Sequence, residues 1–211
     1  MVEIDNIIAN LPLMTRIYIM SCTALMILCS LDIISPLSLY MSWKLVFKGE
    51  IWRLVTCFLY FGPFGVNFFW NIYVLIHYCS SLERVSMNNK PADFLWMLIC
   101  SAIMVLFFSI FFGSSLFFSG CMINVMTYVW GRKNPYAQMA ILFFTVPAPY
   151  LPWILTAMSY FVDFQLGENL LGIFVGHVYY FFKDVYPSMP TSCGLSIFDT
   201  PSCVKNFMGQ T

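Results

Sequence analysis

The feature that most constrains this fold is a series of long apolar runs separated by short segments that hold most of the charges. We distinguish six runs, at residues 17–34, 64–82, 93–112, 115–130, 138–161 and 168–186. A helix that crosses a membrane needs about 20 such residues. Hydrophobic residues make up 60% of the chain and charged residues only 9%, whereas about a quarter of a soluble domain is charged. The pattern therefore predicts an all-α polytopic membrane protein with one membrane domain, residues 1–186, and a tail, residues 187–211.

The composition excludes several other classes of protein. The net charge is zero, so nothing indicates nucleic-acid binding. The eight cysteines have no regular spacing and mostly fall inside apolar runs, which indicates neither a disulfide framework nor a zinc site. We expect no metal and no cofactor. The first 14 residues contain Glu3 and Asp5 but no basic residue, so we expect no cleavable signal and a first run that is retained as an anchor.

The basic residues predict the orientation of the runs. With both termini in the cytosol, the cytosolic segments hold seven of the ten basic residues: Arg16, Arg84, Lys90, Arg132, Lys133, Lys183 and Lys205. The other three lie in one connection, residues 35–63, which is also rich in Leu, Phe, Trp and Tyr. This connection suits the membrane interface, either as an amphipathic segment or as a plain aromatic-belt loop. The tail contains three prolines, and we expect it to be weakly ordered.

Polar residues at membrane depth are costly and need either a partner or a function. Asn67 and Asn71 are four residues apart, so they share one face of the second run. They either hydrogen-bond to a neighbouring helix, which the spacing alone favours, or line a polar site.

A second group of residues lies on the fourth and sixth runs. Gly172 and Gly176 form a small-xxx-small face that lets helices approach closely, and His177 follows it. A Ser on one helix, such as Ser119, and a His on another could form a nucleophile–base pair, with an Asn side chain as oxyanion donor. A structural role for each of these residues is the alternative.

Longer motifs connect these positions. They are GEIWRLVTCFLYFGPFGVNFFWN at 49–71, TYVWGRKNPYAQM at 127–139 and LLGIFVGHVYYFFKDVYP at 170–187. With them the chain resembles the Derlin family, within the rhomboid-like superfamily. The family motif residues are Trp52, Arg53, Gly62, Pro63, Gly172 and Gly176. The resemblance implies a bundle of six transmembrane helices around a water-filled cavity, with an interfacial first loop in which Trp52 lies at headgroup depth and Arg53 pairs with lipid phosphate or backbone carbonyls.

The resemblance also bears on catalysis. It matches Ser119 to the nucleophile of active rhomboids, His177 to the catalytic His and Asn71 to the oxyanion Asn. The Gly that should precede the Ser by two residues is Phe117, and the Gly that should follow the His by three is Tyr180. Derlins are pseudoproteases, so we expect no catalysis. The alternative is an active intramembrane serine protease that uses a Ser119–His177 dyad.

The implied function is retrotranslocation of misfolded proteins from the lumen or membrane of the endoplasmic reticulum (ER), in ER-associated degradation. We expect Asn67, Asn71 and Ser119 to line a polar groove in a thinned membrane. Pro147, Pro149 and Pro152 should break the fifth run and make it a lateral gate. The implied partners are misfolded substrates, an ER-membrane ubiquitin-ligase complex, and further copies or subunits of a channel. The ending FMGQT lacks the family's unfoldase motif, so direct contact with the cytosolic AAA unfoldase is not expected.

Overall fold

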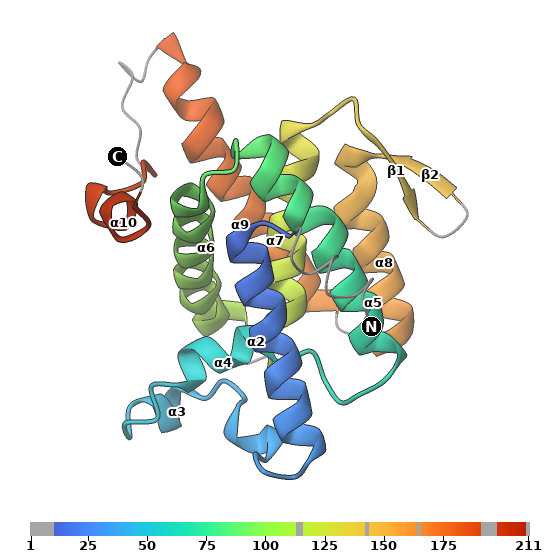
Figure 1. Cartoon of the computed structure of the whole chain (residues 1–211), viewed down its shortest axis with the longest axis vertical. Coiled ribbons are helices and arrows are strands. Elements are labelled where there is room, and N and C mark those ends of the chain that lie inside the picture. Colours follow the sequence, from blue (N-terminus) through green and yellow to red (C-terminus); the bar gives the residue numbers. More distant parts are fainter. Residues whose placement is uncertain (1–10, 113–115, 142–143, 164–165, 191–197, 210–211) are drawn as a thin grey trace.

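Long helices run side by side through most of this chain (Figure 1). The computed structural model describes residues 11–112, 116–141, 144–163, 166–190 and 198–209. The main helices are α2 (Leu13–Ser30), α5 (Val66–Val74), α6 (Pro91–Phe112), α7 (Ser119–Lys133), α8 (Leu151–Asp163) and α9 (Leu166–Tyr180). Two π-helical segments, Leu75–Cys79 and Leu82–Ser86, prolong α5, and a third, Phe181–Val185, followed by a 3-10 turn at Tyr186–Ser188, prolongs α9. The shorter elements are a 3-10 turn (Pro36–Ser38), α3 (Trp43–Val46), α4 (Arg53–Leu59), β1 (Gln138–Ile141), β2 (Phe144–Pro147), a 3-10 turn (Ala148–Tyr150) and α10 (Ser202–Phe207).

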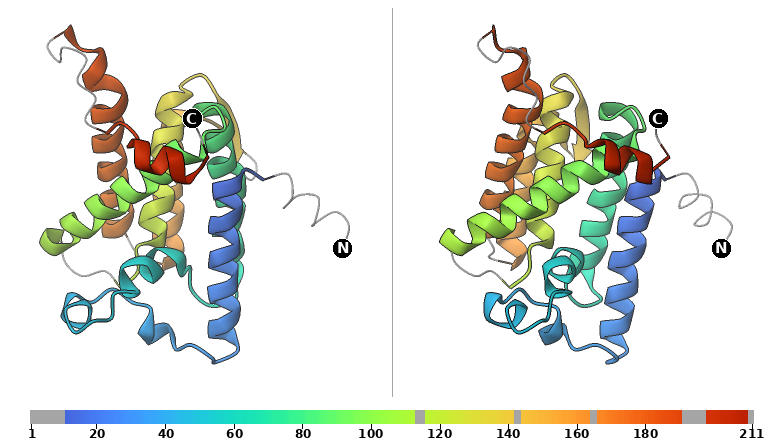
Figure 2. Two further views of the ribbon diagram at one scale, coloured as in Figure 1. Left: turned by 60° about the vertical axis from the view of Figure 1, so that its left-hand side comes forward. Right: turned by 90° about the vertical axis from the view of Figure 1, so that its left-hand side faces the viewer.

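Helix α7 lies at the centre of the bundle. Every residue from Cys121 to Gly131 is buried, because α4, α5, α6, α8 and α9 all contact this helix. The views in Figure 2 show the same arrangement, with the neighbouring helices on different sides of α7. A helix that is buried on all sides positions its polar residues against other protein groups rather than against lipid.

The tightest contact in the bundle is between α7 and α9, and glycines allow it. A Cβ atom at Gly172 would lie 2.4 Å from the Cys121 carbonyl oxygen and 2.9 Å from Asn124 Cβ. A Cβ atom at Gly176 would lie 3.0 Å from Tyr128 Cβ. The two glycines of the small-xxx-small face therefore lie directly on α7, and the contact fixes the register of the two helices.

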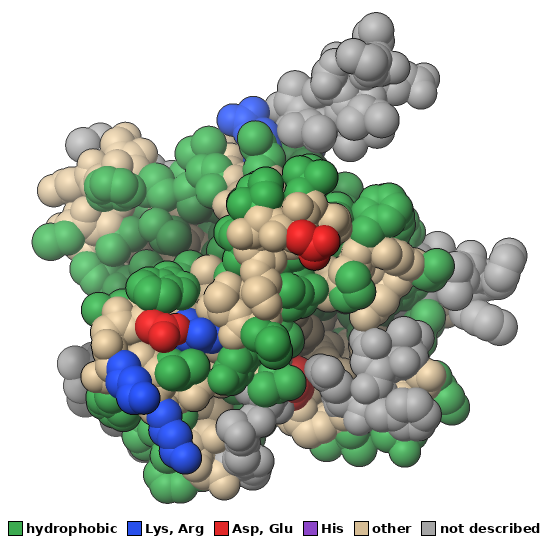
Figure 3. Space-filling model, turned by 90° about the horizontal axis from the view of Figure 1, so that it is seen from below, with side chains coloured by type: hydrophobic (Ala, Val, Ile, Leu, Met, Phe, Trp, Pro, Cys, Tyr) green, Lys and Arg blue, Asp and Glu red, His purple; other side chains and the backbone are tan. Residues whose placement is uncertain are grey.

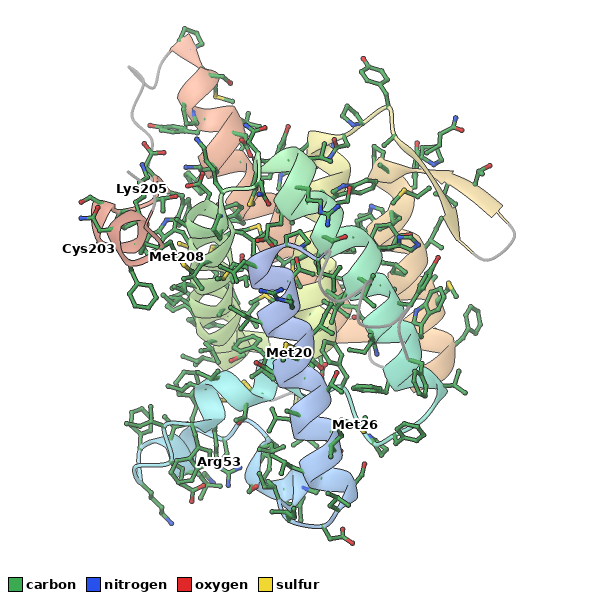
Figure 4. The ribbon with its side chains drawn as sticks, viewed as in Figure 1. Met20, Met26, Arg53, Cys203, Lys205 and Met208 are labelled. Carbon is green, nitrogen blue, oxygen red and sulfur yellow. The ribbon has the colours of Figure 1, made fainter. Side chains whose placement is uncertain are left out.

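The first loop covers one end of the bundle. Arg53 is buried there: its Nε donates to Glu50 Oε2 at 2.6 Å, and its Nη1 donates to the carbonyl oxygens of Leu37 and Tyr40 at 3.1 and 3.0 Å. Arg53 was expected to pair with lipid phosphate or with backbone carbonyls, and the structure shows the pairing with backbone carbonyls. Figure 4 shows the Arg53 side chain among the turns of the loop. Trp52 is exposed. Seen from below in Figure 3, this end is largely hydrophobic with few charged side chains, as an interfacial loop requires.

The opposite end is held together by a buried carboxylate. Glu83 Oε1 and Oε2 accept hydrogen bonds from the backbone N–H groups of Met14 and Thr15, and Oε2 accepts another from the Thr15 hydroxyl at 2.8 Å. These N–H groups belong to the first turn of α2, which has no intrahelical acceptor for them. The negative charge also lies at the positive end of the α2 dipole. Glu83 therefore ties the start of α2 to the end of the helix that α5 begins.

The predicted apolar runs agree with the helices to within a few residues, except for the fifth. Residues 138–141 and 144–147 pair as the antiparallel strands β1 and β2, and α8 begins only at Leu151. Pro147 and Pro149 precede α8, and Pro152 lies in its first turn, where a missing N–H breaks no helical hydrogen bond. The prediction of a helical fifth span broken by prolines is therefore wrong, whereas movement of this segment as a lateral gate stays a prediction. Residue 115, the predicted start of the fourth run, lies outside the described residues, and α7 begins at Ser119.

Two of the described helices, α2 and α6, are long and apolar enough to cross a membrane. The predicted number of six spans is not confirmed, because α7, α8 and α9 have only 15, 13 and 15 residues.

The described part of the tail folds back onto the bundle. The Thr200 hydroxyl hydrogen-bonds to Asp93, at the start of α6, and Lys183 Nζ lies 2.8 Å from Asp199 Oδ1. Helix α10 lies beside α6, with its residues Cys203 and Lys205 labelled in Figure 4. The prediction of weak order is therefore wrong for residues 198–209, while residues 191–197 lie outside the described residues.

Candidate functional site

A polar cavity of about 270 Å³ lies at the end of the bundle that carries the first loop. Its lining residues come from the segment before α5 and from α5, the start of α7, α8 and α9. They are Tyr60, Phe61, Gly62, Pro63, Asn67, Asn71, Phe117, Ser119, Gly120, Ser159 and Asn169. No charged residue lines the cavity in the described part of the chain. Its polar groups are amides and hydroxyls, which can exchange hydrogen bonds with a polar chain without requiring a particular charge.

Helix α5 contributes the two asparagines of the second apolar run. The Asn71 amide nitrogen donates to Asn67 Oδ1 at 3.1 Å and to the Asn67 carbonyl oxygen at 3.0 Å. This pair lies along one helix, so it differs from the interhelical hydrogen bond that the spacing favoured. The pair holds both side chains on the face of α5 that borders the cavity.

Gly62 and Pro63 form the part of the wall that leads into α5. Gly62 has a φ of +94°, a backbone conformation that side chains with a Cβ rarely adopt. The Gly-Pro pair of the family motif therefore shapes the turn that brings the first loop to the cavity.

Ser119 begins α7, and its hydroxyl already has an acceptor. The Oγ atom donates to the Tyr60 carbonyl oxygen at 2.8 Å, and the residue is buried. The Phe117 ring packs against the Tyr60 ring, with centroids 4.9 Å apart and the two planes tilted by 46°. In this arrangement Ser119 joins the first loop to α7, and among the residues that the structure describes its hydroxyl hydrogen-bonds to a backbone carbonyl rather than to a base.

His177 lies in another part of the bundle. Its Nδ1 is 2.7 Å from the Tyr128 hydroxyl, and it lines a separate cavity between α7, α8 and α9. Along α9, the residue beside the first turn of α7 is Asn169, whose Oδ1 is 3.3 Å from the position of a Cβ at Gly120. His177 follows Asn169 by eight residues, which is about 12 Å of helix rise. The structure therefore does not bring Ser119 and His177 together, and the match of His177 to the catalytic position is wrong.

Asn169 takes the place on α9 that the sequence comparison gave to His177. It lines the same cavity as Ser119, and Gly172 follows it by three residues, which is the spacing that His177 lacks. Counting three residues back from Gly172 would have identified Asn169 from the sequence. An amide has no basic nitrogen, so Asn169 cannot accept the proton of a serine nucleophile.

A buried pair of amides lies behind the cavity. The Asn124 amide nitrogen donates to Asn169 Oδ1 at 2.7 Å, and both residues are almost fully buried. The other polar atom of Asn124, Oδ1, accepts no hydrogen bond from the described residues. The pair links the centre of α7 to α9. It was not predictable from the sequence, because two asparagines 45 residues apart form no motif.

The described residues contain no cluster of His, Cys, Asp and Glu that could hold a metal ion. The geometry therefore provides hydrogen-bonding groups in a space between helices, and it provides neither an activated nucleophile nor a metal ligand set.

Comparison with known proteins is consistent with these features. The family model described as the Der1-like family matches residues 11–202. Derlin-2.2 of Zea mays is 40% identical over 208 residues, which cover 93% of this chain and 82% of the maize protein. Derlin-2.2 of Arabidopsis thaliana is also 40% identical over 208 residues, which cover 93% of this chain and 84% of the plant protein. The probable derlin-2 homolog of Dictyostelium discoideum is 36% identical over 207 residues, which cover 94% of this chain and 80% of that protein.

Proposed function

This chain belongs to the Der1-like family of membrane-embedded ER proteins, and on that premise we propose that it assists the retrotranslocation of misfolded proteins in ER-associated degradation. Substrate would pass along the polar cavity, and no peptide bond would be cleaved. The observation that carries the proposal is the cavity itself, because Asn67, Asn71, Ser119 and Asn169 bring uncharged polar groups from three helices to one space.

The short helices around the cavity support the same mechanism. Helix α7 has 15 residues and α8 has 13. At 1.5 Å per residue these helices are about 20–22 Å long, less than the roughly 30 Å of a bilayer's hydrocarbon core. A bilayer that meets short helices thins locally, which shortens the apolar path of a polar polypeptide. The amides of the cavity replace part of the hydration that the polypeptide loses.

We place both termini in the cytosol and the first loop on the lumenal side. The start of α2, the end of α7 and the end of α9 lie at one end of the bundle, as the Glu83–Met14 and Lys133–Asp184 contacts show. This end holds most of the basic residues, and a basic end favours the cytosol. The cavity would then open toward the lumen, where misfolded substrates enter.

The proposed partners follow from this role. A ubiquitin-ligase complex of the ER membrane would receive the substrate, and a cytosolic AAA unfoldase would act with this complex. Further copies of the chain or a channel subunit could complete the path. No observation favours the protease alternative, because the Ser119 hydroxyl donates to the Tyr60 carbonyl oxygen and none of the described residues offers it a base.

Degradation of a misfolded lumenal protein tests the proposal. In cells that depend on this chain, replacing both asparagines (Asn67→Leu and Asn71→Leu) should slow substrate turnover several-fold, because leucines remove the polar wall. Phe69→Leu is the control, since Phe69 is on the same helix, is exposed and does not line the cavity. A pulse-chase experiment at matched expression measures both. Unchanged turnover in the double variant would contradict the proposal.

A further inference from the structure

A second cavity, of about 520 Å³, lies between α7, α8 and α9 near the end of the bundle where α7 ends. It shares no lining residue with the polar cavity described above. Its floor is polar, formed by Tyr128, Arg132 and His177, and its walls are apolar and aromatic.

The three polar side chains form one hydrogen-bonded chain. Arg132 Nε donates to the Tyr128 hydroxyl at 3.0 Å, and this hydroxyl is 2.7 Å from His177 Nδ1. The hydroxyl oxygen accepts from Arg132 and can still donate its own proton to Nδ1, and in that tautomer the imidazole carries its proton on Nε2. With this tautomer the free edge of the chain consists of donors: the terminal N–H groups of the guanidinium and Nε2–H of the imidazole.

The positive charge of Arg132 is not neutralised within the described part of the chain. Its neighbour Lys133 forms an ion pair with Asp184 at 3.3 Å, whereas Arg132 has no carboxylate partner among the described residues. The guanidinium instead lies over the Tyr128 ring, 5.4 Å from its centroid. Arg132 is exposed and its hydrogen bond to Tyr128 uses only Nε, so its terminal N–H groups suit a planar or tetrahedral oxyanion such as a phosphate.

The apolar walls of the cavity indicate what kind of molecule the anionic group belongs to. Trp153 is 53% exposed, Phe174 46% and Leu170 41%, and all three line the cavity on the helices α8 and α9. Large apolar side chains on the outer surface of a membrane bundle face lipid tails rather than water. A basic pocket between helices, open to lipid at headgroup depth, is typical of sites that bind lipid headgroups.

We propose that this cavity binds an anionic phospholipid of the leaflet at which α7 ends. Its phosphate contacts Arg132 and His177, and one acyl chain lies along Trp153 and Phe174. The lipid fills the space between α8 and the α7–α9 pair. Gly176 has a part in this site, because a Cβ there would lie 3.0 Å from Tyr128 Cβ and displace the ring that holds Arg132.

Native mass spectrometry of the purified, delipidated full chain tests the proposal, with phosphatidic acid and phosphatidylcholine as probes. We expect phosphatidic acid to bind at least tenfold more tightly than phosphatidylcholine, and Arg132→Gln to abolish that preference. Lys133→Gln is the matched control: it removes the same charge from the adjacent residue, which does not line the cavity, and should keep the preference. Equal losses in the two variants, or no preference in the wild-type protein, would overturn the proposal.

Two further arms keep the test decisive. Inorganic phosphate at millimolar concentration should not displace the lipid; displacement would mean that the site binds free phosphate. If Arg132→Gln does not fold, a phosphatidic acid with a photoreactive group in its acyl chain replaces the variant. The wild-type adduct should map to the peptides that contain Trp153 or Phe174, and an adduct confined to peptides from other helices than α8 and α9 would overturn the proposal.

Discussion

At the scale of single residues, the absence of one side chain at Gly172 decides how α7 and α9 pack. A Cβ there would lie 2.4 Å from a backbone carbonyl oxygen, which cannot move as a flexible side chain would. Gly172→Ala should therefore destabilise the protein by about 1–3 kcal/mol, the usual cost of an overpacked interior. Reversible unfolding in mixed micelles measures the change.

Gly167→Ala is the control for helix propensity. Gly167 lies on the same helix, and a Cβ there meets nothing within 4 Å in the described structure. We expect this variant to be as stable as the wild type or slightly more stable, because alanine favours a helix. If Gly172→Ala is as stable as Gly167→Ala, the two helices are not in the contact described.

The residues of the polar cavity show what a sequence can predict and what it cannot. Asn67, Asn71 and Ser119 stand out because polar residues are conspicuous in apolar runs, and the structure places all three on one cavity. Asn169 and Ser159 were missed, since their importance depends on the register of α9 and α8 against α7. Gly172 allows the register of α9 against α7, because a Cβ there would lie within 3 Å of Cys121 and Asn124, and no periodicity encodes so close an approach.

At the scale of elements, one carboxylate ties two helices together. Glu83 is fully buried and accepts three hydrogen bonds from the first turn of α2. Glu83→Ala would leave those donors without an acceptor, and an unsatisfied buried polar group costs about 1–3 kcal/mol. Thr15→Val removes only one of the three bonds, so we expect a smaller loss. Unfolding measurements give the free energy of unfolding of both variants. If Glu83→Ala is as stable as the wild type, the Glu83 carboxylate does not hold the start of α2 in place.

The fifth apolar run shows where element prediction fails. Hydropathy alone favours a helix over 138–161, because the run is apolar throughout. Three prolines within six residues disfavour helical backbone in the residues before them, so the chain forms a hairpin and starts α8 at Leu151. The bounds of α2, α5, α6 and α9 were predictable because their ends carry charges, prolines or polar turns.

At the scale of the whole molecule, the orientation in the membrane can be tested with thiols. In the described part of the chain Cys203 is the exposed cysteine. Cys57, in the first loop, is fully buried, and burial raises the pKa of its thiol to about 12, so it stays protonated and unreactive at neutral pH. With Cys193 replaced by Ser, a membrane-impermeant maleimide should label Cys203 in sealed microsomes. In the same background with Cys203→Ser added, a Lys44→Cys variant should be labelled only after permeabilisation. The reverse pattern would mean that the predicted orientation is wrong.

The central claim is that substrate passes along the cavity formed by Asn67, Asn71, Ser119 and Asn169. Site-specific photocrosslinking in microsomes tests it most directly, with a benzophenone side chain in place of Asn67 or, as a control, in place of Phe69. A misfolded lumenal protein arrested in transit should crosslink from position 67 and not from position 69, which is exposed on the same helix and does not line the cavity. Crosslinks from position 69 alone, or from neither position while degradation continues, would show that the substrate takes another route.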